Sequence, residues 1–303
     1  MTTNKMNSFI ERLKQQFTTG STLTKLLYVN AGVFVLVTLI TIVFTLFSVD
    51  VSPWLDYVEM PASWSNLWHQ PWALVTYMFL HADFFHIFFN MLCLYWFGKQ
   101  FLNYYSQKQL VGLYIWGGIS GALLYFLAYN IFPYFAEHID HSFLLGASAS
   151  IMAIIVAVAV AAPNFRIQFL FIGEIKMKYF AGITVLISVL SITGSNAGGE
   201  FAHLGGALFG YMYAVLWQKG TDLSQPINKI IDWFVNLFGS KKKIRVSKTH
   251  FKDRPKTDAD YNQNKKKNEA ELDAILDKIK RSGYQSLTND ERQYLFNQSQ
   301  SLH

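Results

Sequence analysis

Four polar side chains in otherwise apolar stretches of this 303-residue chain could do chemistry: His86, Asn90, Ser148 and His203. A strongly polar or ionisable side chain is costly in hydrocarbon, so each is a functional candidate. A serine hydroxyl becomes a useful nucleophile when a neighbouring base takes its proton, and histidine is the most frequent base. We predict Ser148 as the nucleophile and His203 as its general base, if the fold brings them to about 3 Å.

His86 and Asn90 are four residues apart, so a helix places both side chains on one face. Two donors that point at a common position suit an oxyanion. Each polar residue also has a plainer interpretation, because such residues often form hydrogen bonds between the helices of a membrane bundle. Ser148 and His203 together outweigh these plainer interpretations and favour a catalytic site.

Other chemistries fit the sequence less well. HExxH and HxxEH are absent, the carboxylates Asp83 and Glu200 are expected in loops, and the single Cys93 allows no CxxC site. We therefore expect no metal and no cofactor. The net charge of +6 could suggest a nucleic-acid binder, but 17 of the 26 Lys and Arg lie in residues 219–303. Such clusters set topology in membrane proteins, so we expect no nucleic-acid partner.

The composition indicates a membrane protein, because only 15% of residues are charged, against about 25% in soluble domains. A membrane span needs about 20 mostly apolar residues, or fewer where the bilayer thins. The first apolar stretch is too long for a signal-peptide core and lacks a small-residue cleavage site, so we expect it to be retained. We predict an all-α membrane protein with six spans: Leu26–Phe47, Phe84–Phe101, Leu110–Phe132, Phe143–Ala162, Tyr179–Thr193 and Phe201–Trp217.

The loop charges set the orientation of these spans, because Lys and Arg favour the cytoplasmic side. Loops without any Lys or Arg are 48–83, 133–142 and 194–200. Both termini are therefore predicted to be cytoplasmic. His86, Ser148 and His203 then lie within about six residues of the outer start of their spans, roughly 9 Å along a helix. The topology thus brings three distant positions to one depth near the outer surface.

Small residues would let the fourth and sixth spans approach closely. Ser148 lies in Gly-Ala-Ser-Ala-Ser, which begins at Gly146. Gly206 and Gly210 form a GxxxG face, and His203 lies on the same stripe of the helix. Such surfaces permit the short distance that a Ser–His hydrogen bond between two helices requires.

Three stretches together resemble motifs of bacterial rhomboid proteases, in the same order: PWALVTYMFLHADFFHIFFNMLCLYWFG at 71–98, GASAS at 146–150 and AHLGGALFG at 202–210. The resemblance covers about residues 20–218. It implies a six-helix rhomboid bundle and a Ser148–His203 dyad with no third acidic member. It further implies that His86, Asn90 and the backbone N–H of Ser148 stabilise the oxyanion. Gly146 would keep the chain before the nucleophile open, and His81 would help to hold the first outer loop.

The resemblance also implies a substrate class and a location. Similar proteins cleave membrane proteins near the outer membrane surface, after a small residue and within a weakened helix, since a helix must unwind to expose its carbonyls. It implies the cytoplasmic membrane of a bacterium, with the lipid bilayer as the surroundings. Ala149, Met152 and the pair Trp72-Ala73 depart from the pattern of many relatives and put substrate fit in question.

Two alternatives belong to other function classes. One is a catalytically weak or inactive rhomboid-like protein that binds membrane clients. The other is a small transporter or channel, which would predict internal repeats and broken helices at mid-membrane; no repeat is present in the sequence.

The predicted domain organisation has four parts. The first outer loop carries four Trp residues and is expected in the membrane interface. Ile230, Trp233 and Phe234 are candidates for a short interfacial helix. Thr288 to Glu291 reads as a capping box that opens the second helix of a small hairpin, for which a solvated tail is the favoured role. The parts are an N-terminal cytoplasmic segment, 1–25; the rhomboid protease domain, 26–217; a basic linker, 218–265; and a cytoplasmic helical hairpin, 266–303.

Overall fold

The structure is a computed structural model that describes residues 11, 15, 17, 19–169, 173–238 and 258–300. The chain divides into two compact units, Met1–Ser240 and Lys241–His303. Much of the predicted N-terminal segment, with Lys5, Arg12 and Lys14, lies outside the described residues, as does most of the basic stretch before residue 258.

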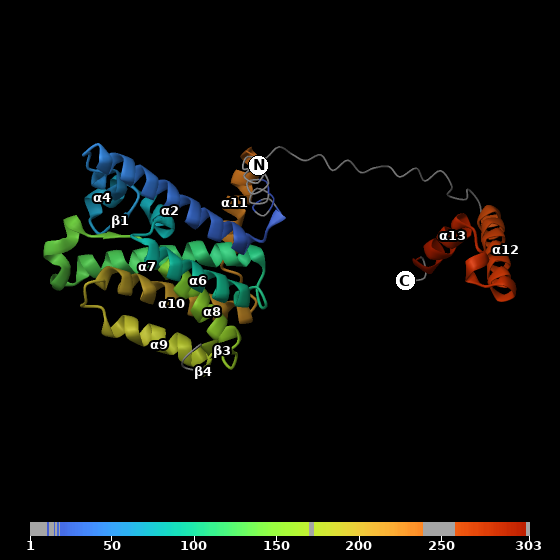
Figure 1. The fold of residues 1–303 in the computed structure, drawn as a ribbon. Helices are drawn as coiled ribbons and strands as arrows, with labels where there is room; N and C mark the ends of the chain where they lie inside the picture. The colour runs from blue at the N-terminus through green and yellow to red at the C-terminus, as the bar shows by residue number, and fades with distance from the viewer. Residues whose placement is uncertain are drawn as a thin grey trace. The chain divides into compact units, whose positions relative to one another are not determined.

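The first unit is built mainly of helices, with two short antiparallel sheets (Figure 1). Its longer helices are α2 (Thr22–Leu46), α6 (Phe84–Phe101), α7 (Gln107–Ile131), α8 (Ser148–Ala161), α9 (Met177–Leu190), α10 (Ala197–Gln218) and α11 (Gln225–Phe238). Its shorter elements are α3 (Ser52–Asp56), β1 (Met60–Pro61), α4 (Trp64–His69), α5 (Ala73–Thr76), η1 (Tyr77–Phe79), η2 (Pro133–His141), β2 (Phe143–Leu144), β3 (Arg166–Phe169) and β4 (Gly173–Lys176).

A helix occupies each of the six predicted spans, but the predicted number of spans is not confirmed. Among the described residues, only α2 and α7 are long and apolar enough to cross a membrane. A third span results if Ala73–Phe79 and Phe84–Phe101, which are bent by 94°, form one broken span. Helices α8 and α9 have 14 residues each, roughly 21 Å, whereas the hydrocarbon core is about 30 Å thick. The predominantly helical fold itself is confirmed.

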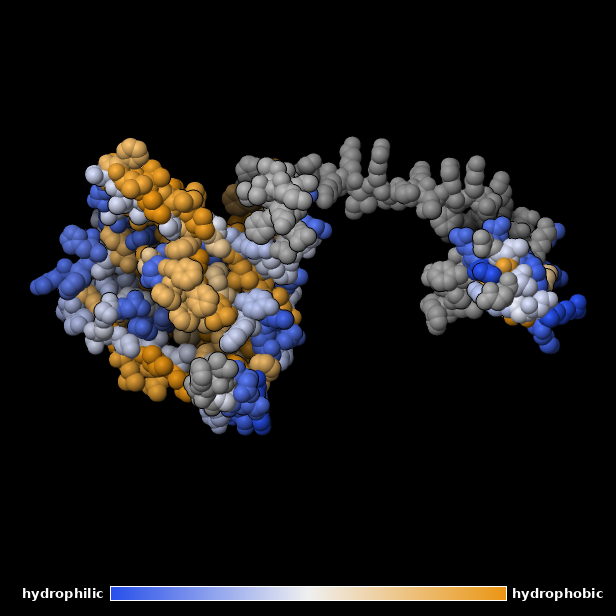
Figure 2. Space-filling view, viewed as in Figure 1, coloured by the Kyte–Doolittle hydropathy of each residue, from blue (hydrophilic) through white to orange (hydrophobic). Residues whose placement is uncertain are grey.

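Helix α2 presents an apolar surface to its surroundings. Figure 2 shows an orange surface where Figure 1 places this helix. Its residues Leu36, Leu39 and Val43 are at least half exposed. Its inward side carries Asn30, which is fully buried and whose amide donates to the Leu26 carbonyl at 2.8 Å and to the Tyr114 hydroxyl of α7 at 3.2 Å. An exposed apolar face with a satisfied polar group on the inner face suits a helix in lipid.

Helices α8 and α10 lie at the centre of the bundle. Helix α8 contacts α6, α7, α9 and α10, and α10 contacts α7, α8 and α9. Nearly all residues of α8 after Ser148 are buried, including Ala149, Ala153 and Ala157. Small side chains on α8 allow α10 to approach it closely, as the sequence predicts.

The segment 48–83, which is predicted to be the first outer loop, is folded against the helices. Strand β1 pairs with β2, so that Met60 lies opposite Leu144, two residues before Gly146. The Thr76 hydroxyl donates to the Val58 carbonyl at 2.6 Å, and the Trp72 indole donates to the Tyr57 carbonyl at 2.7 Å. The loop is therefore tied both to itself and to the segment that leads into α8. Its four Trp side chains are 48–85% exposed, in keeping with the predicted interfacial position.

Burial, and secondarily the nearby Asp56 carboxylate, raises the pKa of Glu59 in this loop from 4.5 to about 7. A carboxyl with a raised pKa in the folded state costs stability once it must ionise. We expect Glu59→Gln to leave the melting temperature unchanged below pH 4.5, to raise it progressively up to pH 7, and to keep that gain above pH 7. Thermal unfolding of the purified protein across this range measures the effect. Glu137→Gln, an exposed carboxylate of η2, is the control; a Glu59→Gln gain that does not change with pH would contradict the prediction.

Helix α11 confirms that the apolar stretch after the bundle is helical. It contacts α7, and Lys108 of α7 forms an exposed ion pair with Asp232 at 2.7 Å. Ile230, Trp233 and Phe234 are each at least half exposed. These exposed apolar side chains fit the predicted interfacial helix, which remains a prediction.

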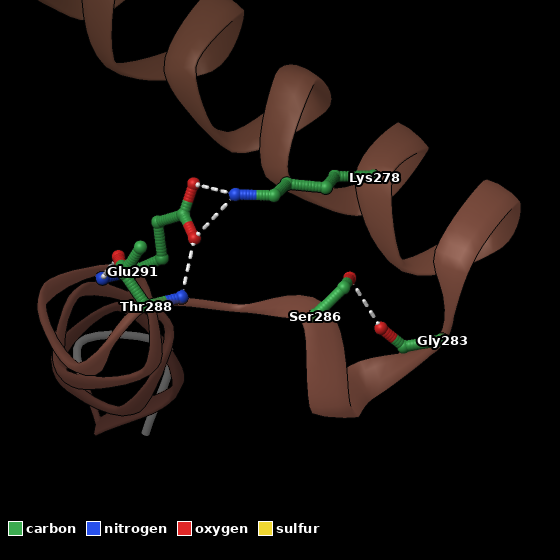
Figure 3. A network of polar contacts seen from close by, with 5 residues as sticks. All are labelled: Lys278, Gly283, Ser286, Thr288 and Glu291. Atoms are coloured by element: carbon green, nitrogen blue, oxygen red, sulfur yellow. Dashed lines mark hydrogen bonds and ion pairs between the residues drawn. The ribbon is translucent and has the colours of Figure 1, made fainter.

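The second unit is a helical hairpin of α12 (Asp258–Ser282), η3 (Tyr284–Ser286) and α13 (Asn289–Gln300). Helix α12 begins eight residues before the predicted boundary at 266 and ends at Ser282. The next residue, Gly283, has a φ of 75°, which favours glycine. The predicted capping box is confirmed, because Thr288 N–H donates to the Glu291 carboxylate at 2.7 Å and Glu291 N–H to the Thr288 hydroxyl at 3.3 Å (Figure 3). Lys278 donates to both oxygens of the same carboxylate, which joins the two helices.

Candidate active site

Ser148 is the first residue of α8. The preceding Gly146 has a φ of +126°, which favours glycine, and its N–H donates to the Tyr77 carbonyl at 2.9 Å. A Cβ at Gly146 would lie 2.9 Å from Nε2 of His86. The predicted need for glycine before the nucleophile therefore has two causes, backbone conformation and the close approach of a histidine ring.

The hydroxyl of Ser148 and Nε2 of His203 are 2.8 Å apart, which is hydrogen-bond distance. Gly206 and Gly210 explain why α10 can come so close to α8. A Cβ at Gly206 would collide with the Ala149 carbonyl oxygen, and a Cβ at Gly210 with the Ala153 carbonyl oxygen. The predicted contact between a glycine face and a small-residue face is thus present.

His86 and Asn90 lie on one face of α6, as their spacing predicts. The Ala82 N–H donates to Nδ1 of His86 at 3.3 Å, so a neutral ring carries its proton on Nε2, the atom nearest to Gly146. Asn90 is buried, and its amide donates one N–H to the His86 carbonyl at 2.9 Å. Its other N–H is available to a ligand in the cavity that both side chains line.

A cavity of about 400 Å³ brings all four predicted side chains together. His86, Asn90, Ser148 and His203 line it from α6, α8 and α10, together with the charged Asp83 that precedes α6. Its other lining residues are apolar: Phe85, Phe89, Cys93, Ile151, Met152 and Ile155. The arrangement presents a nucleophile, a base and hydrogen-bond donors in a mostly apolar cavity, which can perform acyl transfer.

A second cavity, of about 520 Å³, also reaches His86. It is lined by residues from the ends of several helices, among them Ser142, Ser195 and Asn196. The ring of His81 is buried and packs edge-on against His86, with ring centres 5.1 Å apart. His81 therefore contacts the candidate site residue His86, and its expected role in holding the loop remains a prediction.

Sequence reasoning missed two partners of His203. Glu200 was expected in a loop, but it lies in the first turn of α10, where its carboxylate is 3.2 Å from Nδ1 of His203. The hydroxyl of Ser188, on α9, is 3.3 Å from the same nitrogen. The structure thus places a carboxylate next to the Ser148–His203 pair, whereas the family resemblance implies a dyad with no acidic member. The i,i+3 spacing of Glu200 and His203 was a usable signal, whereas Ser188 had none, because it comes from another helix.

Comparison with protein families gives two matches. Residues 68–219 match the Rhomboid domain, a range that contains every candidate site residue. Residues 256–301 match a family of unknown function, DUF6576, and this range covers the helical hairpin.

The curated relatives are eukaryotic proteins that match only in part. Presenilin-associated rhomboid-like protein A, mitochondrial, of Danio rerio is 30% identical over 48% of this chain and 39% of its own length. Presenilin-associated rhomboid-like protein, mitochondrial, of Homo sapiens is 27% identical over 50% of this chain and 40% of its own. RHOMBOID-like protein 12, mitochondrial, of Arabidopsis thaliana is 27% identical over 48% and 46%. The chain thus spans less than half the length of these relatives. Because they are eukaryotic and mitochondrial, they do not support the expected location in the cytoplasmic membrane of a bacterium.

Proposed function

Because the chain belongs to the Rhomboid domain family of integral membrane proteins, we propose that it is an intramembrane serine protease with Ser148 as nucleophile and His203 as base. The observation that carries this proposal is the 2.8 Å contact between the Ser148 hydroxyl and Nε2 of His203 inside a mostly apolar cavity. A serine at this distance from an imidazole can transfer its proton as it attacks a carbonyl.

The proposed reaction has two halves. In the first, Ser148 attacks the scissile carbonyl while Nε2 of His203 takes the hydroxyl proton and then passes it to the leaving amine. In the second, a water attacks the acyl-enzyme carbonyl and gives its proton to Nε2. The bond between the acyl carbon and Oγ then breaks as Nε2 returns the proton to Oγ, which releases the acid and restores Ser148. The polar cavity beside His86 is a suitable source of this water.

The oxyanion of both tetrahedral intermediates would be stabilised by donors from two helices. His86 offers Nε2–H and Asn90 its free amide N–H. The backbone N–H of Ser148 is a third donor. Ser148 lies in the first turn of α8, where N–H groups have no acceptor within the helix, and Ile151 is the first residue to donate to the Ala147 carbonyl. The N-terminus of α8 also favours negative charge, so the helix dipole and the three donors would all stabilise the oxyanion.

The proposed substrates are transmembrane segments of membrane proteins, cut near the outer membrane surface. The mostly apolar cavity suits an apolar substrate segment. We further propose that both termini face the cytoplasmic side, on the distribution of Lys and Arg among the loops.

A second candidate function is a rhomboid-like protein that binds membrane clients without cutting them. The names of these relatives state likeness to rhomboids and do not mention proteolysis. The comparisons therefore support this candidate at least as well as the protease. What favours the protease is that both Ser148 and His203 are present and in contact.

The test uses the purified full-length chain in liposomes with a fluorophosphonate probe, which reacts with activated serines, and several transmembrane reporters. We expect the wild type to be labelled and to cut a reporter, and Ser148→Ala to do neither. Ser150→Ala removes a neighbouring serine that is fully buried; as the matched control it should keep both activities.

Two outcomes would contradict the proposal in different ways. Cleavage that persists in Ser148→Ala would place the nucleophile elsewhere or identify a contaminant. A wild-type protein that binds reporters, is not labelled and cuts none would establish the client-binding function instead.

A further inference from the structure

We propose that Glu200 is a positioning residue that orients His203, so that Ser148, His203 and Glu200 act as a triad, with Ser188 as a second partner of the same imidazole nitrogen. This inference rests on the proposed function. It departs from the dyad that the family resemblance implies, and it follows from the geometry around Nδ1 of His203.

The Glu200 carboxylate is placed by the helix that also carries the base. Both residues belong to α10, three positions apart, so their side chains share one face. The Oε2 to Nδ1 distance is 3.2 Å, and the side chains of Glu200 and His203 are only 14% and 21% exposed. A carboxylate in the first turn of a helix is also stabilised by the helix dipole. The charge is therefore held next to the imidazole and is weakly screened by water.

Ser188 approaches the same nitrogen from another helix. It is 2% exposed, and its hydroxyl oxygen is 3.3 Å from Nδ1. Glu200 and Ser188 therefore offer two acceptors for one Nδ1–H. This shared hydrogen bond fixes the ring on both sides, since α9 and α10 each supply a partner.

The consequence for catalysis concerns the position of one proton. A neutral imidazole whose single proton is held on Nδ1 by acceptors leaves Nε2 unprotonated, and Nε2 is the atom that faces Ser148. As Nε2 takes the serine proton, the ring becomes an imidazolium, and the nearby carboxylate stabilises its positive charge. Glu200 does not line the cavity with Ser148, so its effect reaches the substrate only through His203.

The kinetic arm compares reporter cleavage by the full-length wild type, Glu200→Ala, Glu200→Gln and Ser188→Ala in liposomes. We expect Glu200→Ala to lower kcat about 10- to 100-fold with little change in KM, because the residue acts on the base and not on substrate binding. Glu200→Gln keeps an acceptor oxygen without the charge and should recover part of the loss. Ser188→Ala should lower kcat by less than about 3-fold, because Glu200 still holds the proton. Glu137→Ala, an exposed carboxylate of η2, is the control for lost negative charge.

The spectroscopic arm does not depend on cleavage. In protein with ¹⁵N-labelled histidine, the signals of His203 are identified by their absence in His203→Ala, and they report which ring nitrogen carries the proton. We expect Nδ1 to be protonated in the wild type and in Glu200→Gln, the tautomer with the proton on Nε2 to appear in Glu200→Ala, and the two tautomers to be more evenly mixed when Ser188→Ala is added.

The two arms separate this inference from the proposed function. If the wild type cuts and Glu200→Ala matches it in both kcat and tautomer, Glu200 has no positioning role. A fall in kcat that tracks loss of folded protein, with the tautomer unchanged, would reduce Glu200 to a structural residue and overturn the inference. If the wild type cuts nothing, the proteolytic proposal fails, and the tautomer measurement alone decides whether Glu200 orients His203.

Discussion

The double variant Ser148→Ala/His203→Ala is expected to cleave a reporter no more slowly than either single variant. Each single change should lower kcat by about 10⁴-fold or more, because the serine is a weak nucleophile without its base and the base has no proton to take without the serine. This non-additivity follows from one shared hydrogen bond of 2.8 Å. The measurement is initial cleavage rates of the four proteins at equal amounts of folded protein.

The controls for this cycle leave the site intact. His138→Ala changes an exposed histidine of η2 and should cleave like the wild type. If instead the losses of the two single variants multiplied in the double variant, Ser148 and His203 would act independently, and the dyad would be wrong.

The second large effect is expected at the glycines between α8 and α10. An added methyl group at Gly206 or Gly210 meets a backbone carbonyl oxygen of α8, which cannot rotate away. We expect Gly206→Ala and Gly210→Ala each to lower the free energy of unfolding by about 1–3 kcal/mol. Because the helices must separate, Ser148 and His203 also move apart, and a displacement of about 1 Å can lower the rate about 100-fold.

A matched variant distinguishes this clash from a general effect of alanine. Gly182→Ala lies in α9, where an added Cβ meets nothing within 4 Å. Its effect on stability should be neutral or a gain of about 0.5–1 kcal/mol, since alanine is the better helix former. The clash at Gly206 is with the backbone of Ala149, so adding Ala149→Gly should not rescue it. Thermal unfolding and cleavage rates measure both effects; wild-type behaviour of Gly206→Ala would refute the packing described.

The sequence alone identified the candidate site residues because their types conflict with their surroundings. Polar side chains in apolar stretches, glycines at helical spacing and loops free of Lys and Arg are local features, visible without any fold. The positions of Ser148, His203, His86 and Asn90 around one cavity were predicted in this way. The capping box at Thr288 was also predictable, since it depends on residues three apart.

The predicted number of spans is not confirmed, and the reason is also physical. Hydropathy marks apolar stretches, but α8 and α9 are too short to cross the hydrocarbon core alone, and their ends are decided by packing against neighbours. The same boundary error hid Glu200. The sixth span was expected to start at the apolar Phe201, whereas α10 begins at Ala197 and so includes the carboxylate.

What the sequence by itself determined about this protein is which residues can do the chemistry and which helices carry them. Only the tertiary structure decided how those helices meet: that Nε2 of His203 faces Ser148, and that Nδ1 faces Glu200 and Ser188. Periodicity and capping are set by residues a few positions apart, whereas the distance between two helices is set by many weak contacts along both helices. No single residue determines all these contacts, so the partners of His203 are seen only in the packed bundle.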